Sequence, residues 1–190
     1  MLLLIQATAL FVLGAQPLMP AVQTVQDEAK VISGILPVKS SIPGLTIDAA
    51  MTNVGSSFDL PSGKSARKGR ARLRSEDGAS LVDVLVVVYE SISDAKSRFA
   101  EIKRTVPAPS LLTKVSTTGV KFGDECWFHG SDSTVSFRLG RVFCTVLPNY
   151  RLSSDDRNRE ARVDRAGMQI ANEVERLILK QPTLSGRKGS

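Results

Sequence analysis

Apolar and polar residues follow their clearest pattern between residues 81 and 105, which read LVDVLVVVYESISDAKSRFAEIKRT. Valine occupies every second position from Val82 to Val88, and the positions between them are also largely apolar toward the end of the run. A strand of this kind is typical of a sheet centre that is covered on both faces. An apolar stripe then recurs at helical spacing, at Ala95, Phe99, Ile102 and Val106. The pattern predicts a buried strand that leads into an amphipathic helix.

The ends of this helix are marked by capping and breaking residues. Ser91 is suited to cap the N-terminus, and Asp94 lies three residues later in a capping-box-like position near the positive end of the helix dipole. Pro107 and Pro109 end the helix, because proline cannot continue its hydrogen bonding.

Three short strands are predicted after the helix, over residues 125–129, 134–138 and 141–147. Turn residues separate them at positions 130–133 and 139–140. If these turns set the register, alternation places seven residues on one face, which should be the core: Cys126, Phe128, Val135, Phe137, Val142, Cys144 and Val146.

A long amphipathic helix is predicted over residues 155–180, and Pro182 ends it. Residues 182–190 then form a mobile tail. The order of elements predicts an α+β domain over residues 64–181. We expect a mainly antiparallel sheet of about five strands, with the central helix and the long C-terminal helix packed on one face.

The N-terminal segment, residues 1–21, resembles a targeting sequence. It is almost entirely apolar up to Ala15 and is then broken by Pro17 and Pro20. Its length suits the core of a cleaved signal peptide better than a membrane span, although no lysine or arginine precedes it. A retained anchor and a helix of the fold are the alternatives. We expect export to the periplasm or the cell exterior, with the segment either removed or kept as a membrane anchor.

Residues 22–63 have weaker patterns and are rich in proline, serine and glycine in their second half. We expect an irregular segment with a short helix over residues 22–35 and a short strand near Thr46 or Phe58. The whole chain of 190 residues, 42% hydrophobic and 23% charged, suits one globular domain once its ends are set aside.

Basic residues gather just before the central strand. Six of them lie within residues 64–74 with no acidic residue among them: Lys64, Arg67, Lys68, Arg70, Arg72 and Arg74. On a strand, alternation places Arg70, Arg72 and Arg74 on one face. The apolar residues between them, Ala71 and Leu73, then face inward.

This basic run has two interpretations. Guanidinium groups offer forked donors, so the run predicts binding of phosphate or carboxylate groups, and the net charge of +6 favours anionic partners. The alternative is a solvated edge strand whose charges prevent aggregation. No aromatic residue lies within the run, which argues against specific nucleic-acid binding.

The two cysteines, Cys126 and Cys144, fall on the outer strands of the three predicted after the helix, and on the same face. The strand between them separates them by about 10 Å, twice the interstrand spacing. A disulfide does not span that distance. We expect either two free buried thiols or, under another strand order in an oxidising compartment, one disulfide.

No catalytic, metal or cofactor motif is evident, and we expect no cofactor. His129, the only histidine, alternates away from Cys126, so the two residues do not form a nucleophilic pair. One histidine and two separated cysteines do not make a zinc site. Trp127 also alternates away from Cys126, and it either covers the far side of the sheet or lines a ligand groove.

Three stretches carry a resemblance to known proteins: VVVYESISDAKSRFAEIK, GDECWF and VSFRLGRVFCTV, followed by the long terminal helix. Their order is similar to that of small exported bacterial domains of unknown function. More distantly, it resembles the extracellular sensor domains of actinobacterial serine/threonine kinases. The resemblance covers about residues 70–180 and implies ligand sensing outside the cytoplasm, with no catalytic residues. The kinase-linked domains carry two disulfides, whereas this chain has only two cysteines.

The sequence supports three hypotheses for function. The first is an exported, non-enzymatic binding or sensor-like domain for an unknown ligand or protein partner, which uses an uncovered sheet face around Trp127, Phe143 and Tyr89. The second is a basic adaptor that binds anionic polymers or a membrane surface through residues 64–74. The third is a hydrolase-like enzyme with Asp124, Glu125 or His129 as acid or base, which requires these groups in one cleft. We expect a protein that is not an enzyme.

Overall fold

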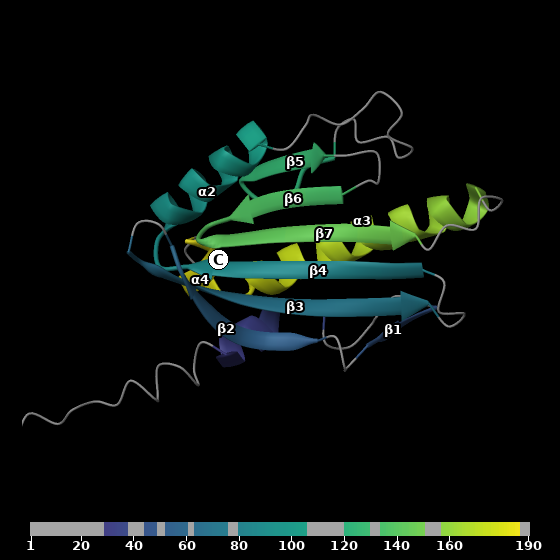
Figure 1. The fold of residues 1–190 in the computed structure, drawn as a ribbon, viewed down its shortest axis with the longest axis horizontal. Helices are drawn as coiled ribbons and strands as arrows, with labels where there is room; N and C mark the ends of the chain where they lie inside the picture. Colours follow the sequence, from purple (N-terminus) through teal and green to yellow (C-terminus); the bar gives the residue numbers. More distant parts are fainter. Residues whose placement is uncertain are drawn as a thin grey trace, which may run out of the picture.

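The computed structural model describes residues 29–37, 44–48, 52–60, 63–75, 80–105, 120–129, 134–150 and 157–186. Within these ranges, seven strands form one antiparallel sheet (Figure 1). The strands are β1 (Leu45–Ile47), β2 (Asn53–Asp59), β3 (Ser65–Ser75), β4 (Ser80–Tyr89), β5 (Glu125–His129), β6 (Thr134–Leu139) and β7 (Val142–Tyr150). The helices are a helical segment over residues 29–35, α2 (Ile92–Thr105), α3 (Arg157–Leu179) and the short α4 (Pro182–Ser185).

Six strands lie side by side in the order β1-β3-β4-β7-β6-β5, and β2 pairs with β3 next to β1. β2 pairs with the first part of β3 and β1 with its last residues, so both lie on the side of β3 that faces away from β4. The α+β class and the antiparallel sheet are confirmed, with more strands than the five expected. β3 is not an edge strand, so the interpretation of the basic run as a solvated edge is wrong.

β4 is the buried centre of the sheet, as its sequence predicts. Val82, Val84 and Val86 are 0% exposed and contribute to the larger of two apolar cores. Val87 and Tyr89 alternate to the other face, where they belong to a second core. Both faces of this strand are therefore covered.

The two long helices cover opposite faces of the sheet, and the prediction that both pack on one face is wrong (Figure 1). Ile170, Val174 and Ile178 of α3 pack in the core of Val82, Val84 and Val86. Ala95 and Phe99 of α2 pack in the core of Val87 and Tyr89. The reason is that β4 is apolar on both sides, so that each face requires its own apolar cover.

Strands β5, β6 and β7 form the predicted meander with the predicted register. Phe137 pairs with Cys126 on one side and with Cys144 on the other. The seven residues expected on one face all contribute to the α3 core, with Cys126 and Phe128 at its partly buried margin. Both cysteines are free thiols, because Phe137 lies between them.

The chain before β3 belongs to the same core. Ile32, Ile35 and Leu36 are buried in the α3 core, next to Gly69 of β3. A Cβ atom on Gly69 would lie 2.3 Å from Cγ2 of Ile32, so the close approach of this helical segment requires glycine there. The sequence predicts one short strand, near Thr46 or Phe58, and the structure has a strand at each of these positions, β1 and β2. The core thus starts well before residue 64, where the sequence placed the domain boundary.

The C-terminal end is also ordered further than expected. Residues 182–190 were predicted as a mobile tail, but residues 182–185 form α4, and Leu184 is fully buried. The predicted long helix is confirmed as α3, with its first predicted residues, 155 and 156, outside the described residues.

The predicted signal peptide or anchor at residues 1–21 also lies outside the described residues. Among the helices that the structure describes, none combines the length and the apolar character needed to cross a membrane.

Candidate functional site

Four of the six basic residues in the predicted run share one face of the sheet. They occupy every second position of β3 and are Lys68, Arg70, Arg72 and Arg74. Their partners in the β4 register are, in the same order, Val87, Leu85, Asp83 and Leu81. Val87 packs under α2, so these four residues, which we call the basic row, lie on the α2 face. Arg67 lies opposite Val88 and therefore falls on the α3 face. Lys64 precedes β3.

The alternation along β3 arises from buried small and apolar residues. Ala71 and Leu73 are 0% exposed in the α3 core. Because side chains alternate between the two faces of a strand, Arg70, Arg72 and Arg74 lie on the opposite face, which is the α2 face. The prediction that these three arginines share a face is confirmed. β3 is held by strands on both sides, so the row stands on a rigid part of the sheet.

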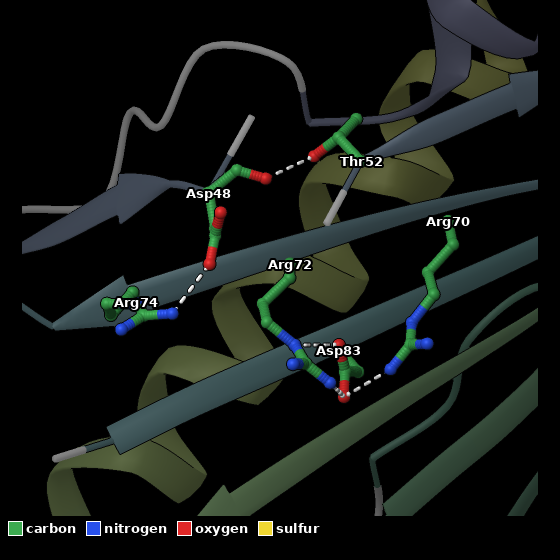
Figure 2. A network of polar contacts seen from close by, with 6 residues as sticks. All are labelled: Asp48, Thr52, Arg70, Arg72, Arg74 and Asp83. Carbon is green, nitrogen blue, oxygen red and sulfur yellow. Dashed lines mark hydrogen bonds and ion pairs between the residues drawn. The ribbon is translucent and has the colours of Figure 1, made fainter. Parts of the chain in front are cut away.

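Asp83 of β4 binds two arginines of the basic row, as Figure 2 shows. Arg72 donates from Nε to Oδ1 at 2.8 Å and from Nη2 to Oδ2 at 2.8 Å, which is a bidentate fork. Arg70 donates from Nη2 to the same Oδ2 at 3.0 Å. One carboxylate therefore holds two guanidinium groups next to each other.

The third arginine has a separate partner. Arg74 donates from Nη2 to Oδ2 of Asp48 at 2.7 Å (Figure 2). Asp48 is placed by two backbone interactions, since its N–H donates to the carbonyl of Arg72 and its own carbonyl accepts from the Thr52 hydroxyl. The side chains of Arg70 and Arg74 remain 43% and 47% exposed, whereas that of Arg72 is 17% exposed.

Burial and the two arginines act on the pKa of Asp83 in opposite directions. Burial raises this pKa, but the hydrogen bonds and positive charges of Arg72 and Arg70 outweigh it, and the net pKa is below that of an ordinary aspartate. The pKa of Arg72 is raised, chiefly by its hydrogen bond to Asp83. Two guanidinium groups and one carboxylate together leave one net positive charge at this point of the sheet.

Lys64 lies apart from the basic row and binds the start of α2. Its Nζ is 3.0 Å from Oδ1 of Asp94. The Asp94 N–H donates to the Ser91 hydroxyl at 3.1 Å, which confirms the predicted cap of the helix. Lys64 thus links the end of the β2–β3 connection to α2.

The aromatic residues of the predicted groove also lie on the α2 face, but α2 covers them. Tyr89 is 2% and Phe143 4% exposed, and Trp127 packs at the margin of the same core. Phe99 of α2 contacts Phe143 edge to face, with ring centroids 6.4 Å apart. The pKa of Tyr89 is raised to about 12 because the hydroxyl is buried. The expectation of an uncovered face at these residues is wrong.

Lys103 of α2 reaches over the Trp127 ring, with Nζ 5.2 Å from the ring centroid. The Trp127 indole N–H is buried and makes no hydrogen bond to any residue that the structure describes. Trp127 is therefore part of the contact between α2 and β5.

The acidic residues suggested for acid–base chemistry have a structural partner. Arg138 of β6, whose side chain is 3% exposed, donates to Asp124 at 2.9 Å and to Glu125 at 2.8 Å. Asp124 also accepts from the N–H of Gly140, which closes the turn between β6 and β7. Along β5, Cys126 pairs with Phe137 and His129 pairs with Thr134. The described residues bring no group of three or more metal-ligating side chains together.

Sequence reasoning missed Asp83, Asp48 and Arg138. The signal for Asp83 was present, since it is the one charged residue between Leu81 and Tyr89 in an otherwise apolar strand. Such a residue requires a partner when it is buried. Asp48 lies in a segment with no periodic pattern, and its pairing depends on how β1 meets β3.

Comparison of the sequence with protein-family models, with curated proteins and with solved structures found no match.

Proposed function

We propose that this protein is a non-enzymatic binding domain whose ligand carries phosphate or carboxylate groups and binds at the basic row. The observation that carries the proposal is the pair of guanidinium groups, Arg70 and Arg72, which Asp83 holds next to each other on a rigid strand. Arginine is the side chain best suited to bind such groups, because its forked N–H donors match two oxygens of one anion.

The geometry favours binding because the arginine side chains are already ordered before a ligand arrives. A long basic side chain loses rotamer freedom when it binds a ligand. Arg72 is already fixed by two hydrogen bonds and Arg70 by one. Each guanidinium carries further N–H donors beyond those that Asp83 accepts. Arg74 and Lys68 extend the positive charge along the same strand.

The groove hypothesis has less support, because α2 packs on Tyr89 and Phe143. The hydrolase hypothesis has less support because Asp124 and Glu125 both form ion pairs with the buried Arg138. We keep export to the periplasm or the cell exterior as part of the proposal, on the basis of residues 1–21. N-terminal sequencing of the protein recovered outside the cytoplasm tests that part, and an intact Met1 on fully cytoplasmic protein contradicts it.

Binding to labelled inorganic polyphosphate, followed by fluorescence anisotropy over a salt series, tests the main proposal. Polyphosphate presents phosphates without bases, so binding reports on charge and hydrogen bonding alone. We expect binding that weakens steeply with salt, because each contact releases a counterion. Arg70→Gln with Arg74→Gln removes two exposed arginines of the row and is expected to weaken binding by about tenfold or more.

The matched control is Arg98→Gln with Arg176→Gln. These arginines have similar exposure, 46% and 52%, and each pairs with a glutamate on its own helix. The two double variants change the net charge equally, so only the location differs. Equal losses in both variants would indicate a general charge effect, and no binding by the natural protein at low salt would contradict the proposal outright.

A further inference from the structure

Asp83 is an unusual residue for its position. It lies in the central strand between Val82 and Val84, which are fully buried on the opposite face, and its side chain is 11% exposed. Leu85 is its neighbour on the same face of β4. An apolar residue at position 83 would continue this face without the cost of removing a carboxylate from water. The need for a stable sheet alone does not account for an aspartate here.

The hydrogen bonds of Asp83 have a specific geometric effect. Arg70 and Arg72 are neighbours on one side of β3, so their positive charges repel, and each side chain has many accessible rotamers. Both donate to the same oxygen, Oδ2, at 3.0 Å and 2.8 Å. The carboxylate therefore holds the two guanidinium groups at one point, over the β3–β4 pairing (Figure 2).

We propose that Asp83 is a positioning residue that orients Arg70 and Arg72 so that the two guanidinium groups together bind a single oxyanion group, a phosphate or a carboxylate, of the ligand. This inference rests on the proposed function and gives the basic row a defined centre. A ligand oxyanion receives hydrogen bonds from both arginines at once, instead of meeting isolated point charges. Arg74, bound to Asp48, and Lys68 then add attraction for the rest of an anionic ligand.

Removal of the Asp83 charge distinguishes this arrangement from simple charge attraction, because the two explanations predict opposite changes in phosphate affinity. Asp83→Asn raises the net charge of the protein by one unit and adds an attractive charge at the row. If the arginines act as independent charges, phosphate should bind more tightly. If Asp83 orients them, phosphate should bind more weakly, because the guanidinium groups separate and must be ordered again by the ligand.

The experiment is a titration of the full chain with inorganic phosphate at low salt, followed by calorimetry and by the NMR resonances of the arginine Nε–H groups. In the natural protein, we expect the Arg70 and Arg72 resonances to shift along one common binding curve. We expect Asp83→Asn to weaken phosphate binding by about tenfold, which corresponds to the loss of one or two charge-assisted hydrogen bonds. Glu173→Gln makes the same charge change at the exposed Arg176 pair on α3 and should leave phosphate binding within about twofold.

Arg70→Lys is the second variant, for the case in which Asp83→Asn does not fold. Arg70 is half exposed, and lysine keeps its charge but lacks the fork. We expect weaker phosphate binding with the same net charge. Phosphate binding that is unchanged or tighter in Asp83→Asn or in Arg70→Lys overturns the positioning role. If polyphosphate binding still requires Arg70 and Arg74 in that case, the proposed function stands and only this inference fails; if the natural protein binds neither phosphate nor polyphosphate, both fail.

Discussion

Gly140 packs directly against the carbonyl group of Leu184, so that a Cβ atom at Gly140 would lie 2.0 Å from that oxygen. The same carbonyl accepts a hydrogen bond from the N–H of Arg141 at 3.0 Å. Gly140 has a φ of +58°, which is the left-handed region, in the turn between β6 and β7. This turn therefore receives α4 and fixes the end of the described chain on the sheet.

Gly140→Ala should destabilise the protein through both its backbone conformation and this contact. We expect a loss of about 3 kcal/mol in the free energy of unfolding, because overpacking adds to the cost of a left-handed alanine. Urea denaturation measures the loss. Gly63→Ala is the control, since Gly63 has a φ of +75° but an added Cβ would have no atom of the described residues within 4 Å. It should lose only about 1 kcal/mol. Equal losses in the two variants would show that α4 does not pack on Gly140 in solution.

Phe99→Ala should remove the centre of the core beneath α2. Phe99 is 0% exposed and packs against Phe143. We expect a loss of about 3 to 5 kcal/mol in the free energy of unfolding, as for other buried phenylalanines. Trp127 is the only tryptophan and lies in the same contact, so its fluorescence should shift to the red.

The control for this substitution is Leu179→Ala, at a position that is 40% exposed. Its loss should stay below about 1 kcal/mol. A small effect of Phe99→Ala with unchanged Trp127 fluorescence would mean that α2 does not cover this face.

The contribution of Asp83 to stability should depend on pH in one direction. Burial raises its pKa, but Arg72 and Arg70 lower it further, so the folded-state pKa is below the ordinary value of 3.8. A group with a depressed pKa contributes stability above its unfolded pKa, and this contribution is lost as the pH falls through the folded pKa. Urea unfolding should therefore show a difference between the natural protein and Asp83→Asn at pH 7 that shrinks below about pH 4. A difference that grows on acidification would contradict the ion pairs.

The thiols of Cys126 and Cys144 should stay unpaired even under oxidising conditions. Phe137 pairs with both residues and lies between them, so no disulfide forms without reordering the strands. Burial raises the pKa of both thiols, which keeps them protonated and slow to react. A thiol reagent should count two thiols in denaturant and react slowly with the folded protein. An intact mass lower by two hydrogens after mild oxidation would show that the cysteines pair.

The strands and helices could be predicted from the sequence where the pattern of apolar residues fits only one arrangement. Alternation of Cys126, Phe128, Val135 and Phe137 fixed the register of the meander, because only one face there is apolar enough to be the α3 core. The face chosen by α2 could not be predicted, because Val86 and Val87 are both apolar and the stripe of Ala95 and Phe99 fits either side. The apolar stripe of such a helix can cover either face of the sheet, so its position depends on which face the other elements already cover.

For the candidate site, the sequence could predict the arrangement of the arginines along one strand but not the residues that they bind. Alternation along β3 places Arg70, Arg72 and Arg74 on one face whatever their neighbours are. Their partners depend on tertiary pairing, since Asp83 meets Arg72 through the β3–β4 register and Asp48 meets Arg74 through β1. The contribution of residues 29–35 to the core could not be predicted either, because it depends on a tertiary contact, the close approach of Ile32 to Gly69.

The pairing of β4 with β7 has a consequence for the speed of folding. β3 and β4 are adjacent in the chain, as are β5, β6 and β7, so each group closes only short loops. The sheet becomes continuous when Val88 meets Val142 at one end of the pairing and Ser80 meets Tyr150 at the other. Contacts between residues so distant in sequence must close a long loop before they give any stabilisation, and such contacts slow folding. We therefore expect the joining of the β3–β4 pair to the β5–β6–β7 meander to be the rate-limiting step. The ion pairs of Asp83 with Arg70 and Arg72 form only after β3 and β4 have met.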